Sequence, residues 1–541
     1  MTKQVTKPTT KLRYIPPARP LLAFLAFLAL ALSWSLGTPL LSAADEPEQS
    51  VKAAAVVRGE FSGPVRVWNF ADWQSTYTTP DYLEVEYRLP RSLVRALAEH
   101  DPACYAFSLQ RTAACTVRAN AHRIAEAGDI ATTHMNYSPL YYALVGWPSL
   151  LLHGDAALYG MRVASALITA ALLAAAFTTS ARRGKAAAAG VLAAATPAVI
   201  YFGAVVNPSG LEISCALLAW ASLLSLTRAG PGAEGLRRDR ILFTAAAAAL
   251  VLVRPLGPAW LAIVVASALA TSPRPREQLL RAVRDRSARW MGAVLAVALL
   301  ATAAWDATQN TTGIVARVNA AYTMAKGAYL TLGQTPVFFN QMVGLLGWND
   351  VHSPDATTQT WYGAVAALLL AAVVLGNRRE RLVLAALAVL TVLFPIAFEA
   401  YSGAKYGVGW QGRYTLPLAV GIPLLAAEVL RRRMTAAAGR DLSRALAGTL
   451  GVVLALAYLC EVWWAWRRYA QGFGATARFV PVPAQWSPPI SWPAMLGLAV
   501  LGCAGLLTLL RWPADGAAQE PAGALKPWPL VSRLKEYTRT E

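Results

Sequence analysis

The chain has 541 residues, of which 56% are hydrophobic and only 15% are charged, and its mean hydropathy is positive. A soluble domain carries about 25% charged residues because its whole surface faces water, so this composition excludes a soluble globular protein. The net charge of +19 comes from 49 Lys and Arg against 30 Asp and Glu. Most of this excess lies in short segments between apolar runs, where it indicates membrane topology and contact with anionic lipids rather than nucleic-acid binding.

The first apolar run covers residues 21–41 and follows several basic residues, among them Arg13 and Arg19. The hydrophobic part of a signal peptide is typically about 7–15 residues long, so this run predicts a first span that is retained. A cleaved signal peptide stays open as an alternative, because Ser42-Ala43-Ala44 resembles a signal-peptidase site.

Basic clusters between the later runs mark the ends of spans that face the cytoplasm. With every cluster inside, the sequence predicts about twelve spans in one membrane domain over residues 21–511. We expect spans near residues 21–43, 156–180, 186–204, 208–228, 241–254, 256–271, 290–305, 357–376, 381–398, 414–430, 443–463 and 492–511. Both termini are then cytoplasmic, with residues 1–20 before the first span and a tail over residues 512–541.

The apolar and aromatic run at residues 137–152 is too short for a typical span. Counting it as one would also place the basic cluster at residues 182–185 outside. We therefore expect a juxtamembrane or re-entrant helix over residues 139–153, beginning at Ser138-Pro139, because proline suits the first turn of a helix.

Three regions are expected outside the cell: residues 44–138, residues 306–355, and residues 399–413 together with 467–491. Alternation of apolar and polar residues at 65–68 and 83–87 predicts a small strand pair in the first loop, the mixed part of an otherwise all-α membrane protein. Cys104 and Cys115 share this oxidising compartment, which favours a disulfide between them. The histidines of the loop complete no metal-ligand spacing, so no metal site is predicted.

Two acidic residues, Asp45 and Glu46, lie immediately outside the first span. A carboxylate at the mouth of a membrane cavity can act as a general base on a hydroxyl group. The structural alternative is a capping box formed by Asp45 and Glu48, with Pro47 in the first turn of the helix.

A second polar motif, Asn207-Pro208-Ser209, precedes the span at 208–228, and Glu212 completes another capping pattern with Ser209. Asn207 or Ser209 is expected to cap this span, and the functional alternative is contact with a lipid phosphate at the helix N-terminus. Arg254 lies alone in apolar sequence, just before Pro255, Gly257 and Pro258. A charge at membrane depth is costly, so it is expected to face a cavity and bind phosphate, with snorkelling as the alternative.

The loop at residues 399–414 places Lys405 and Arg413 beside aromatic residues such as Tyr414. Cations suit a phosphate and aromatic rings suit a sugar face, whereas the structural alternative is an interfacial aromatic belt. The cluster from Trp348 to His352 is interpreted as surface structure, and contact with an acceptor is the alternative.

In this order, the motifs resemble the DUF2142 family of predicted bacterial multipass membrane proteins. The matching stretches are Gly37-Thr38-Pro39 with Asp45-Glu46-Pro47, the segment 52–59, Cys104 to Phe107 with Cys115, Tyr137-Ser138-Pro139 with Tyr141-Tyr142, Asn207-Pro208, Arg254-Pro255, and Gln411 to Tyr414. The family in turn resembles the GT-C glycosyltransferases, which use polyprenyl-phosphate sugars and hold a catalytic acid just after the first span.

This resemblance implies a GT-C-like enzyme in the bacterial plasma membrane that moves a sugar from a polyprenyl-phosphate donor to a glycan or protein of the cell envelope. It implies Asp45 and Glu46 as catalytic residues, and Arg254, Lys405, Arg413, Tyr414 and Asn207 as ligands of the donor. Many relatives have a His shortly after the acidic pair, where this chain has Gln49. No cofactor is required, and a divalent cation stays open. The alternatives are a transporter of a lipid-linked glycan or solute and a non-catalytic scaffold of the envelope.

Overall fold

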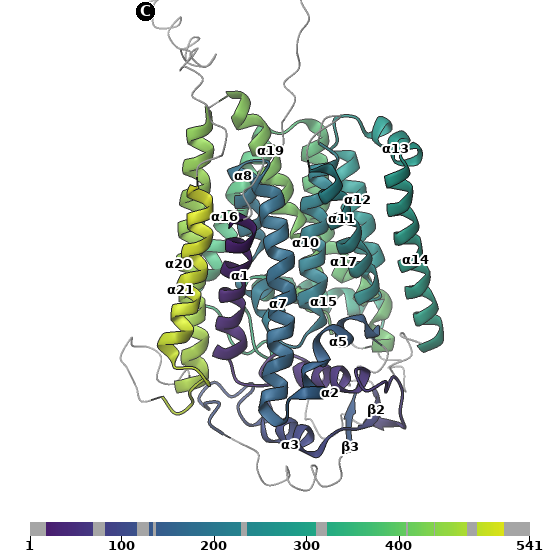
Figure 1. The fold of residues 1–541 in the computed structure, drawn as a ribbon, viewed down its shortest axis with the longest axis vertical. Coiled ribbons are helices and arrows are strands. Elements are labelled where there is room, and N and C mark those ends of the chain that lie inside the picture. Colours follow the sequence, from purple (N-terminus) through teal and green to yellow (C-terminus); the bar gives the residue numbers. More distant parts are fainter. Residues whose placement is uncertain are drawn as a thin grey trace, which may run out of the picture.

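Long helices form the body of the molecule and lie side by side with roughly parallel axes (Figure 1). The computed structural model describes residues 18–68, 82–115, 129–133, 137–228, 235–309, 322–406, 409–437, 439–472 and 484–512. Most of the two terminal segments predicted to be cytoplasmic therefore lies outside the described residues. Among the described residues, nine helices are long and apolar enough to cross a bilayer, or ten when one bent pair counts as a span.

Every predicted span has a helix at its place, which confirms an all-α membrane protein. These helices are α1 (Ala18–Gly37), α7 (Gly154–Ala181), α8 (Lys185–Ala194) with α9 (Pro197–Ala204), α10 (Pro208–Leu226), α11 (Leu236–Val253), α12 (Gly257–Ala270), α14 (Arg286–Gln309), α16 (Asp355–Leu375), α17 (Arg378–Tyr406), α18 (Gly412–Ala419) with α19 (Gly421–Ala437), α20 (Gly439–Gln471) and α21 (Trp492–Arg511).

Several boundaries differ from the prediction. The helix α17 continues to Tyr406, through part of the outer loop expected at residues 399–413. The first span was expected to reach residue 43, but α1 ends at Gly37 because Pro39 cannot continue its hydrogen bonds. The second outer loop, expected over residues 306–355, contains the helix α15 (Met324–Val343), which packs against α17 and α18. A short helix, α13 (Pro275–Arg284), also precedes α14.

The first long loop folds at one end of the bundle, which we call the loop end (Figure 1). The predicted strand pair is confirmed and joined by a third strand, giving an antiparallel sheet of order β1-β2-β3 in which Val85 pairs with Val65 and Thr132. The elements of this loop are α2 (Glu46–Val56), β1 (Val65–Trp68), β2 (Tyr82–Arg88), α3 (Arg91–Glu99), η2 (Pro102–Cys104), β3 (Asp129–Thr132), α5 (Pro139–Gly146) and α6 (Pro148–Leu151).

The short apolar run forms α5, which begins at Pro139 as predicted and packs on α2 instead of crossing the bundle. Gly146 permits this close packing, because a Cβ atom there would lie 2.2 Å from the carbonyl oxygen of Ala53. The helix α5 therefore lies as a layer between α2 and the spans α7, α10 and α11.

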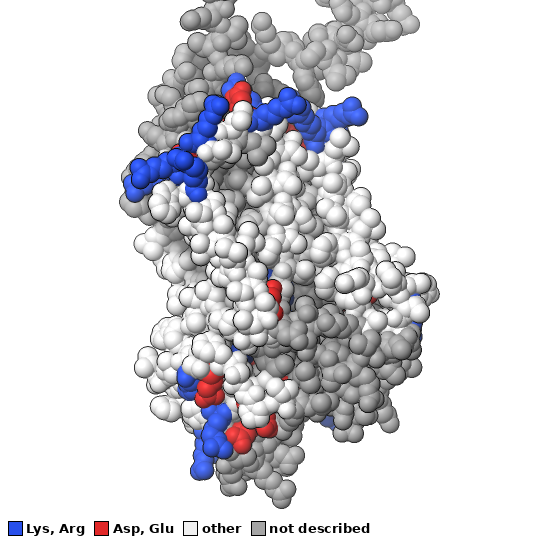
Figure 2. Space-filling model, turned by 90° about the vertical axis from the view of Figure 1, so that its right-hand side faces the viewer, with Lys and Arg blue, Asp and Glu red and all other residues white. Residues whose placement is uncertain are grey.

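The opposite end of the bundle, which we call the basic end, carries the arginine clusters. Figure 2 shows Lys and Arg side chains along this end, above a broad band of the surface with few charges. Arg19 of α1 stacks on Trp512 after α21, with its guanidinium 5.3 Å from the ring centre, so the first and last described helices share this end. The clusters are therefore on one side, as predicted, and their exposure to the cytoplasm remains a prediction.

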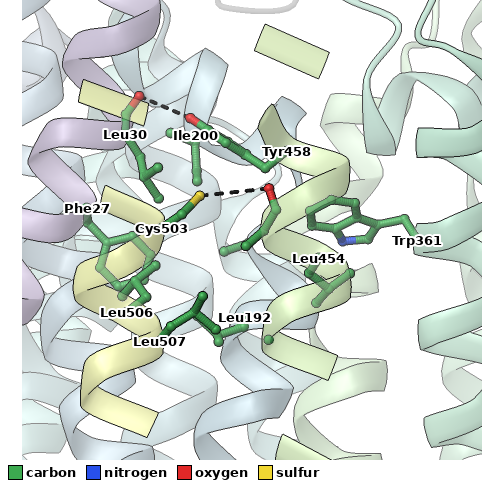
Figure 3. Close-up of a pocket in the computed structure, with 13 residues that line it drawn as sticks. Phe27, Leu30, Leu192, Ile200, Trp361, Leu454, Tyr458, Cys503, Leu506 and Leu507 are labelled. Atoms are coloured by element: carbon green, nitrogen blue, oxygen red, sulfur yellow. Dashed lines mark hydrogen bonds between the residues drawn. The ribbon is translucent and has the colours of Figure 1, made fainter. Parts of the chain in front are cut away.

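One small cavity lies within the bundle between α1, α8, α20 and α21 (Figure 3). It measures about 40 Å³, and apolar side chains such as Phe27, Leu192 and Leu506 line most of it. Its polar lining group, the Tyr458 hydroxyl, donates a hydrogen bond of 3.0 Å to the carbonyl oxygen of Leu30. No charged side chain lines this cavity, so we place no chemistry there.

Candidate functional site

The turn that follows α1 exposes one carboxylate at the loop end. Asp45 has a φ of 63°, in the left-handed region, and its side chain is 23% exposed. It occupies the N-cap position of α2, but its side chain makes no capping hydrogen bond. The carboxylate instead forms an ion pair with Arg413. The capping-box interpretation of Asp45 is therefore wrong.

Glu46, the second predicted catalytic residue, points into the protein and is 1% exposed. Its two oxygens accept hydrogen bonds of 2.6 Å each from Nε and Nη2 of Arg162 in α7. The backbone amides of Ala43 and Val206 also donate to it, at 3.4 and 3.1 Å. With both oxygens occupied, Glu46 is positioned to hold the turn in place rather than to meet a substrate.

Arg413, the partner of Asp45, lies in the first turn of α18. It is 1% exposed and donates to the Asp45 carboxylate, to the carbonyl oxygen of Ala44 at 3.2 Å and to the hydroxyl of Tyr414 at 3.0 Å. The same Ala44 oxygen accepts a 3.0 Å hydrogen bond from the side-chain amide of Asn207. Two spans, α10 and α18, therefore fix the backbone next to Asp45.

Asn207 also caps α10 as predicted, because its side-chain oxygen accepts from the amide of Ser209 at 3.0 Å. The second predicted capping pair does not form: Glu212 accepts a hydrogen bond from Trp260 in α12 at 3.1 Å and pairs with Arg254 at 3.7 Å. Asn207 is thus linked to the site by its hydrogen bond to Ala44, whereas Glu212 is linked to it by its ion pair with Arg254.

Arg254 and Arg413 both approach the ring of Tyr414. Both guanidinium groups lie 5.0 Å from the ring centre of Tyr414, and that of Arg254 also lies 5.5 Å from the ring of Tyr137. Burial raises the pKa of Tyr137 to about 12, so its phenol is neutral and can donate a hydrogen bond. The structure therefore brings Asp45, Arg413, Tyr414 and Arg254 together from three distant parts of the chain.

The turn that carries Arg254 lies below the expected membrane surface. The 14 residues of α12 span only about 21 Å, less than a hydrocarbon core of about 30 Å. Gly257 allows the chain to turn back from α11 into α12, because a Cβ atom there would lie 1.9 Å from the carbonyl oxygen of Leu250 in α11. Arg254 is consequently held at membrane depth with little exposure.

Arg254 also lines a cavity of about 280 Å³ between α5, α11 and α14. Its walls are mostly apolar, and Asp306 is the other charged residue that lines it within the described part of the chain. The lining residues are Ser138, Pro139, Leu140, Leu252, Arg254, Pro255, Ala301, Thr302, Trp305 and Asp306. The cavity thus combines one cation with a surface that suits hydrocarbon.

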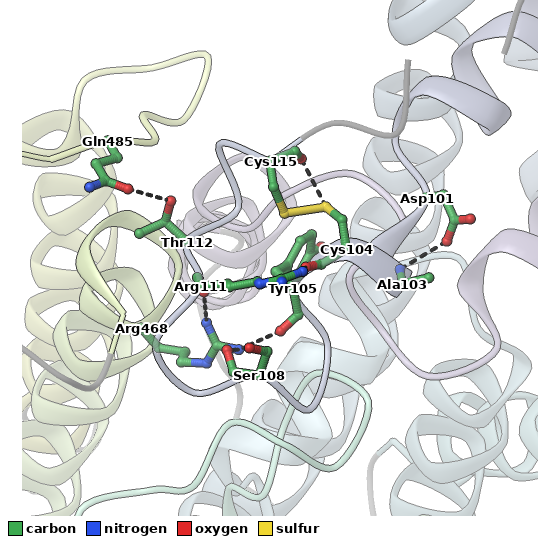
Figure 4. The surroundings of a disulfide bond; sticks show 10 residues. All are labelled: Asp101, Ala103, Cys104, Tyr105, Ser108, Arg111, Thr112, Cys115, Arg468 and Gln485. Carbon is green, nitrogen blue, oxygen red and sulfur yellow. Dashed lines mark hydrogen bonds between the residues drawn. A yellow bond between two sulfur atoms is a disulfide. The ribbon is translucent and has the colours of Figure 1, made fainter. Parts of the chain in front are cut away.

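A disulfide joins Cys104 and Cys115 in the first loop, as predicted (Figure 4). The loop that it closes is fastened by Arg468 at the end of α20, which is completely buried and donates to the carbonyl oxygens of Tyr105, Ser108 and Arg111 at 2.9, 3.2 and 2.8 Å. The disulfide loop is therefore part of the membrane domain's packing and not a free appendage.

Asp350 connects this loop to the site. It accepts from Arg468 and from the amide of Phe107, both at 3.2 Å, and from the amide of Trp348 at 3.0 Å. The adjacent carbonyl oxygen of Gly347 accepts a 2.9 Å hydrogen bond from the amide of Ala44. The cluster interpreted from the sequence as surface structure thus supports the backbone beside Asp45.

The prediction for Lys405 falls on a side chain outside the described residues. Gln49, which follows the acidic pair, is buried and accepts a hydrogen bond from Tyr142 of α5, so it faces the juxtamembrane helix. Within the described residues, no group of three or more His, Cys, Asp and Glu could hold a metal ion.

Sequence reasoning missed Arg162, Glu212, Tyr137 and Arg468. Arg162 and Arg468 had a detectable signal, because each is a charge within or at the end of an apolar run and therefore needs a buried partner. Tyr137 and Glu212 were noticed only as parts of a helix start and a capping pattern, and nothing local indicates that they would meet Arg254.

These features define a multispanning membrane protein with a charged site at one end of its helix bundle, beside a largely apolar cavity. Residues 27–422 match the DUF2142 family of predicted membrane proteins, and the chain belongs to that family. No curated protein matches the sequence.

Two crystal structures of ArnT from Cupriavidus metallidurans are similar to the chain, one bound to undecaprenyl phosphate and one in the apo state. Each alignment covers 92% of this chain and 77% of ArnT at 13% identity, with TM-scores of 0.42 and 0.40 respectively. Because these scores are low, we base the proposed function on the geometry of the site.

Proposed function

We propose that the protein is a membrane glycosyltransferase of the GT-C type, which moves a sugar from a polyprenyl-phosphate donor to an acceptor of the cell envelope. The observation that supports this best is the convergence of Asp45, Arg413 and Arg254 around Tyr414, next to a largely apolar cavity. A carboxylate, two cations and a hydrocarbon-compatible surface are the groups that such a transfer needs.

Arg254 is the proposed ligand of the donor phosphate. Its Nε and Nη2 atoms are buried and have no hydrogen-bond partner among the described residues. Unsatisfied guanidinium donors beside a cavity suit the oxygens of a phosphate, which accept several charge-assisted hydrogen bonds. The apolar walls formed by Leu140 and Leu252 suit the polyprenyl chain.

Asp45 is the proposed general base. It accepts the proton of the acceptor hydroxyl while the hydroxyl oxygen forms a bond to the anomeric carbon of the sugar. The bond between that carbon and the phosphate oxygen breaks, and its electron pair leaves with the polyprenyl phosphate. Attack opposite the leaving group inverts the anomeric configuration, and Arg254 and Arg413 stabilise the departing anion.

Arg413 is shared between the base and the leaving group in this mechanism. In the structure it pairs with Asp45. A bound phosphate offers it a second anionic partner, and the carboxylate then becomes available for the acceptor hydroxyl. Tyr414 and Tyr137 provide ring faces for the sugar beside the two cations.

The test uses cells from which the native protein has been removed. These cells are supplied with either the wild type or Asp45→Asn, and their glycans and polyprenyl-linked sugars are compared. Removing a general base is expected to lower transfer by about 10²–10⁴-fold, so the envelope glycan decreases and its lipid-linked precursor accumulates. Asp129→Asn is the matched control, because Asp129 is also a partly exposed carboxylate of the first outer region paired with an arginine, Arg88. Both variants should reach the membrane in equal amounts.

Full transfer by Asp45→Asn would refute the assignment of the base. If the protein instead alters the distribution of the lipid-linked sugar between the two sides of the membrane, and sugar transfer to the acceptor is unchanged, the protein is a transporter. Unchanged glycans in cells without the protein would favour the scaffold alternative.

A further inference from the structure

A second charged cluster lies at the basic end, where α7, α10 and α19 all finish. Four arginines surround Glu428 of α19: Arg183 donates to its Oε1, Arg431 donates to both oxygens at 2.9 and 3.0 Å, and Arg228 and Arg432 approach Oε1 to 3.6 and 3.7 Å. Because Arg183 and Arg228 follow α7 and α10, far in the sequence from α19, the cluster is a product of the fold.

The centre of the cluster is buried. The side chains of Arg183 and Arg228 are 6% and 3% exposed, and that of Glu428 is 2% exposed. Burying an ionised group without a counter-charge is costly, so buried guanidinium groups are normally matched by acids. The two most buried guanidinium groups, those of Arg183 and Arg228, share one described carboxylate, that of Glu428, which Arg431 also contacts.

Hydrogen-bond donors in the cluster likewise outnumber the acceptors that they contact. Arg183 Nη1 and Arg228 Nε and Nη1 are buried and have no hydrogen-bond partner among the described residues. The other Nη of Arg228 donates to the Thr271 hydroxyl at 2.9 Å. Helix C-termini attract cations and explain in part why arginines gather here, but a helix dipole does not occupy these individual N–H groups.

We propose that Arg183 and Arg228 bind a phosphate group at the basic end, either the headgroup of an anionic phospholipid or a soluble phosphate compound. A phosphate supplies both features that the cluster lacks, negative charge and several acceptor oxygens. It would also join the turn after α7 to the ends of α10 and α19. The site is separate from that at Asp45, because the 19 residues of α10 place Asn207 and Arg228 about 28 Å apart. It does not depend on the proposed transfer reaction.

The test uses the full chain purified in detergent and stripped of native lipid. Thermal unfolding is followed while phosphatidylglycerol, phosphatidylcholine or inorganic phosphate is added. The wild type should be stabilised by phosphatidylglycerol more than by phosphatidylcholine if the source is a lipid, and by inorganic phosphate alone if the source is soluble. The double variant Arg183→Gln/Arg228→Gln should lose this stabilisation.

The matched control is Arg274→Gln/Arg276→Gln, which removes the same charge from exposed positions at the same end. It should keep the wild-type response. If the Gln double variant does not fold, Arg183→Lys/Arg228→Lys retains the charge but not the planar set of donors. Its affinity for the stabilising phosphate should be roughly tenfold weaker. An unchanged response in the Lys variant, or a wild type that neither phosphatidylglycerol nor phosphate stabilises, would overturn the proposal.

Discussion

Substituting Glu46 by Gln tests whether this carboxylate holds the turn after α1 or takes part in transfer. In the structure Glu46 and Arg162 are both about 1% exposed and share two hydrogen bonds of 2.6 Å. Removing one partner leaves a buried charge without its counter-charge, which typically costs about 3–5 kcal/mol. Arg162 keeps acceptors in the carbonyl oxygens of Ser35, Thr38 and Pro39, which places the expected loss near the lower value.

The measurement is thermal unfolding of the purified protein in detergent. Glu46→Gln should lower the midpoint by several degrees, because a loss of about 3 kcal/mol is large against a net stability of about 5–15 kcal/mol. Glu48→Gln is the matched control two residues away, since its hydrogen bond from Thr133 can survive the change. Removing both charges in Glu46→Leu/Arg162→Met should recover part of the loss. If Glu46→Gln unfolds at the wild-type midpoint and yet abolishes transfer, Glu46 is catalytic and the reasoning fails.

Two further predictions concern the loop end. Burial lowers the pKa of Lys52 to about 8, so between about pH 8 and 10.5 the unfolded chain binds more protons and stability should rise with pH. Lys52→Met should remove this dependence on pH and raise the free energy of unfolding by at most about 3 kcal/mol below pH 8. Unfolding midpoints at pH 7 and pH 10 measure the effect. A dependence on pH that persists in the variant would contradict the assignment. Arg468→Met should release the disulfide loop and speed reduction of Cys104–Cys115 by dithiothreitol about tenfold or more, because a buried network of charge-assisted hydrogen bonds is lost. Mass spectrometry of alkylated cysteines measures this rate, which should stay unchanged in Arg276→Met.

Much of the membrane domain can be predicted from the sequence, because hydropathy and charge indicate whether a segment lies in lipid or in water. Apolar runs predicted the spans, and basic clusters predicted which helix ends lie together, as the contact of Arg19 with Trp512 illustrates. The helix α15 was missed because its residues are less apolar and include Pro336, so they were interpreted as an outer loop. Its helical state depends on packing against α17 and α18.

The candidate site residues were predictable in type but not in their pairing. Asp45, Arg254 and Arg413 were singled out because charges next to apolar spans need a partner. Local sequence favoured a capping role for Asp45, yet tertiary structure gives it Arg413, 368 residues away, because a buried guanidinium must be paired whereas a helix N-terminus can be satisfied in other ways.

The sequence by itself determined an all-α membrane protein with a disulfide-closed loop and a short helix at its surface, since each of these depends on local composition and spacing. Only the tertiary structure decided that Glu46 faces Arg162, 116 residues away, while its neighbour Asp45 faces the site. The physical reason is that an ion pair in a helix bundle depends on which helices pack together and how each is rotated, and neither is specified by hydropathy alone.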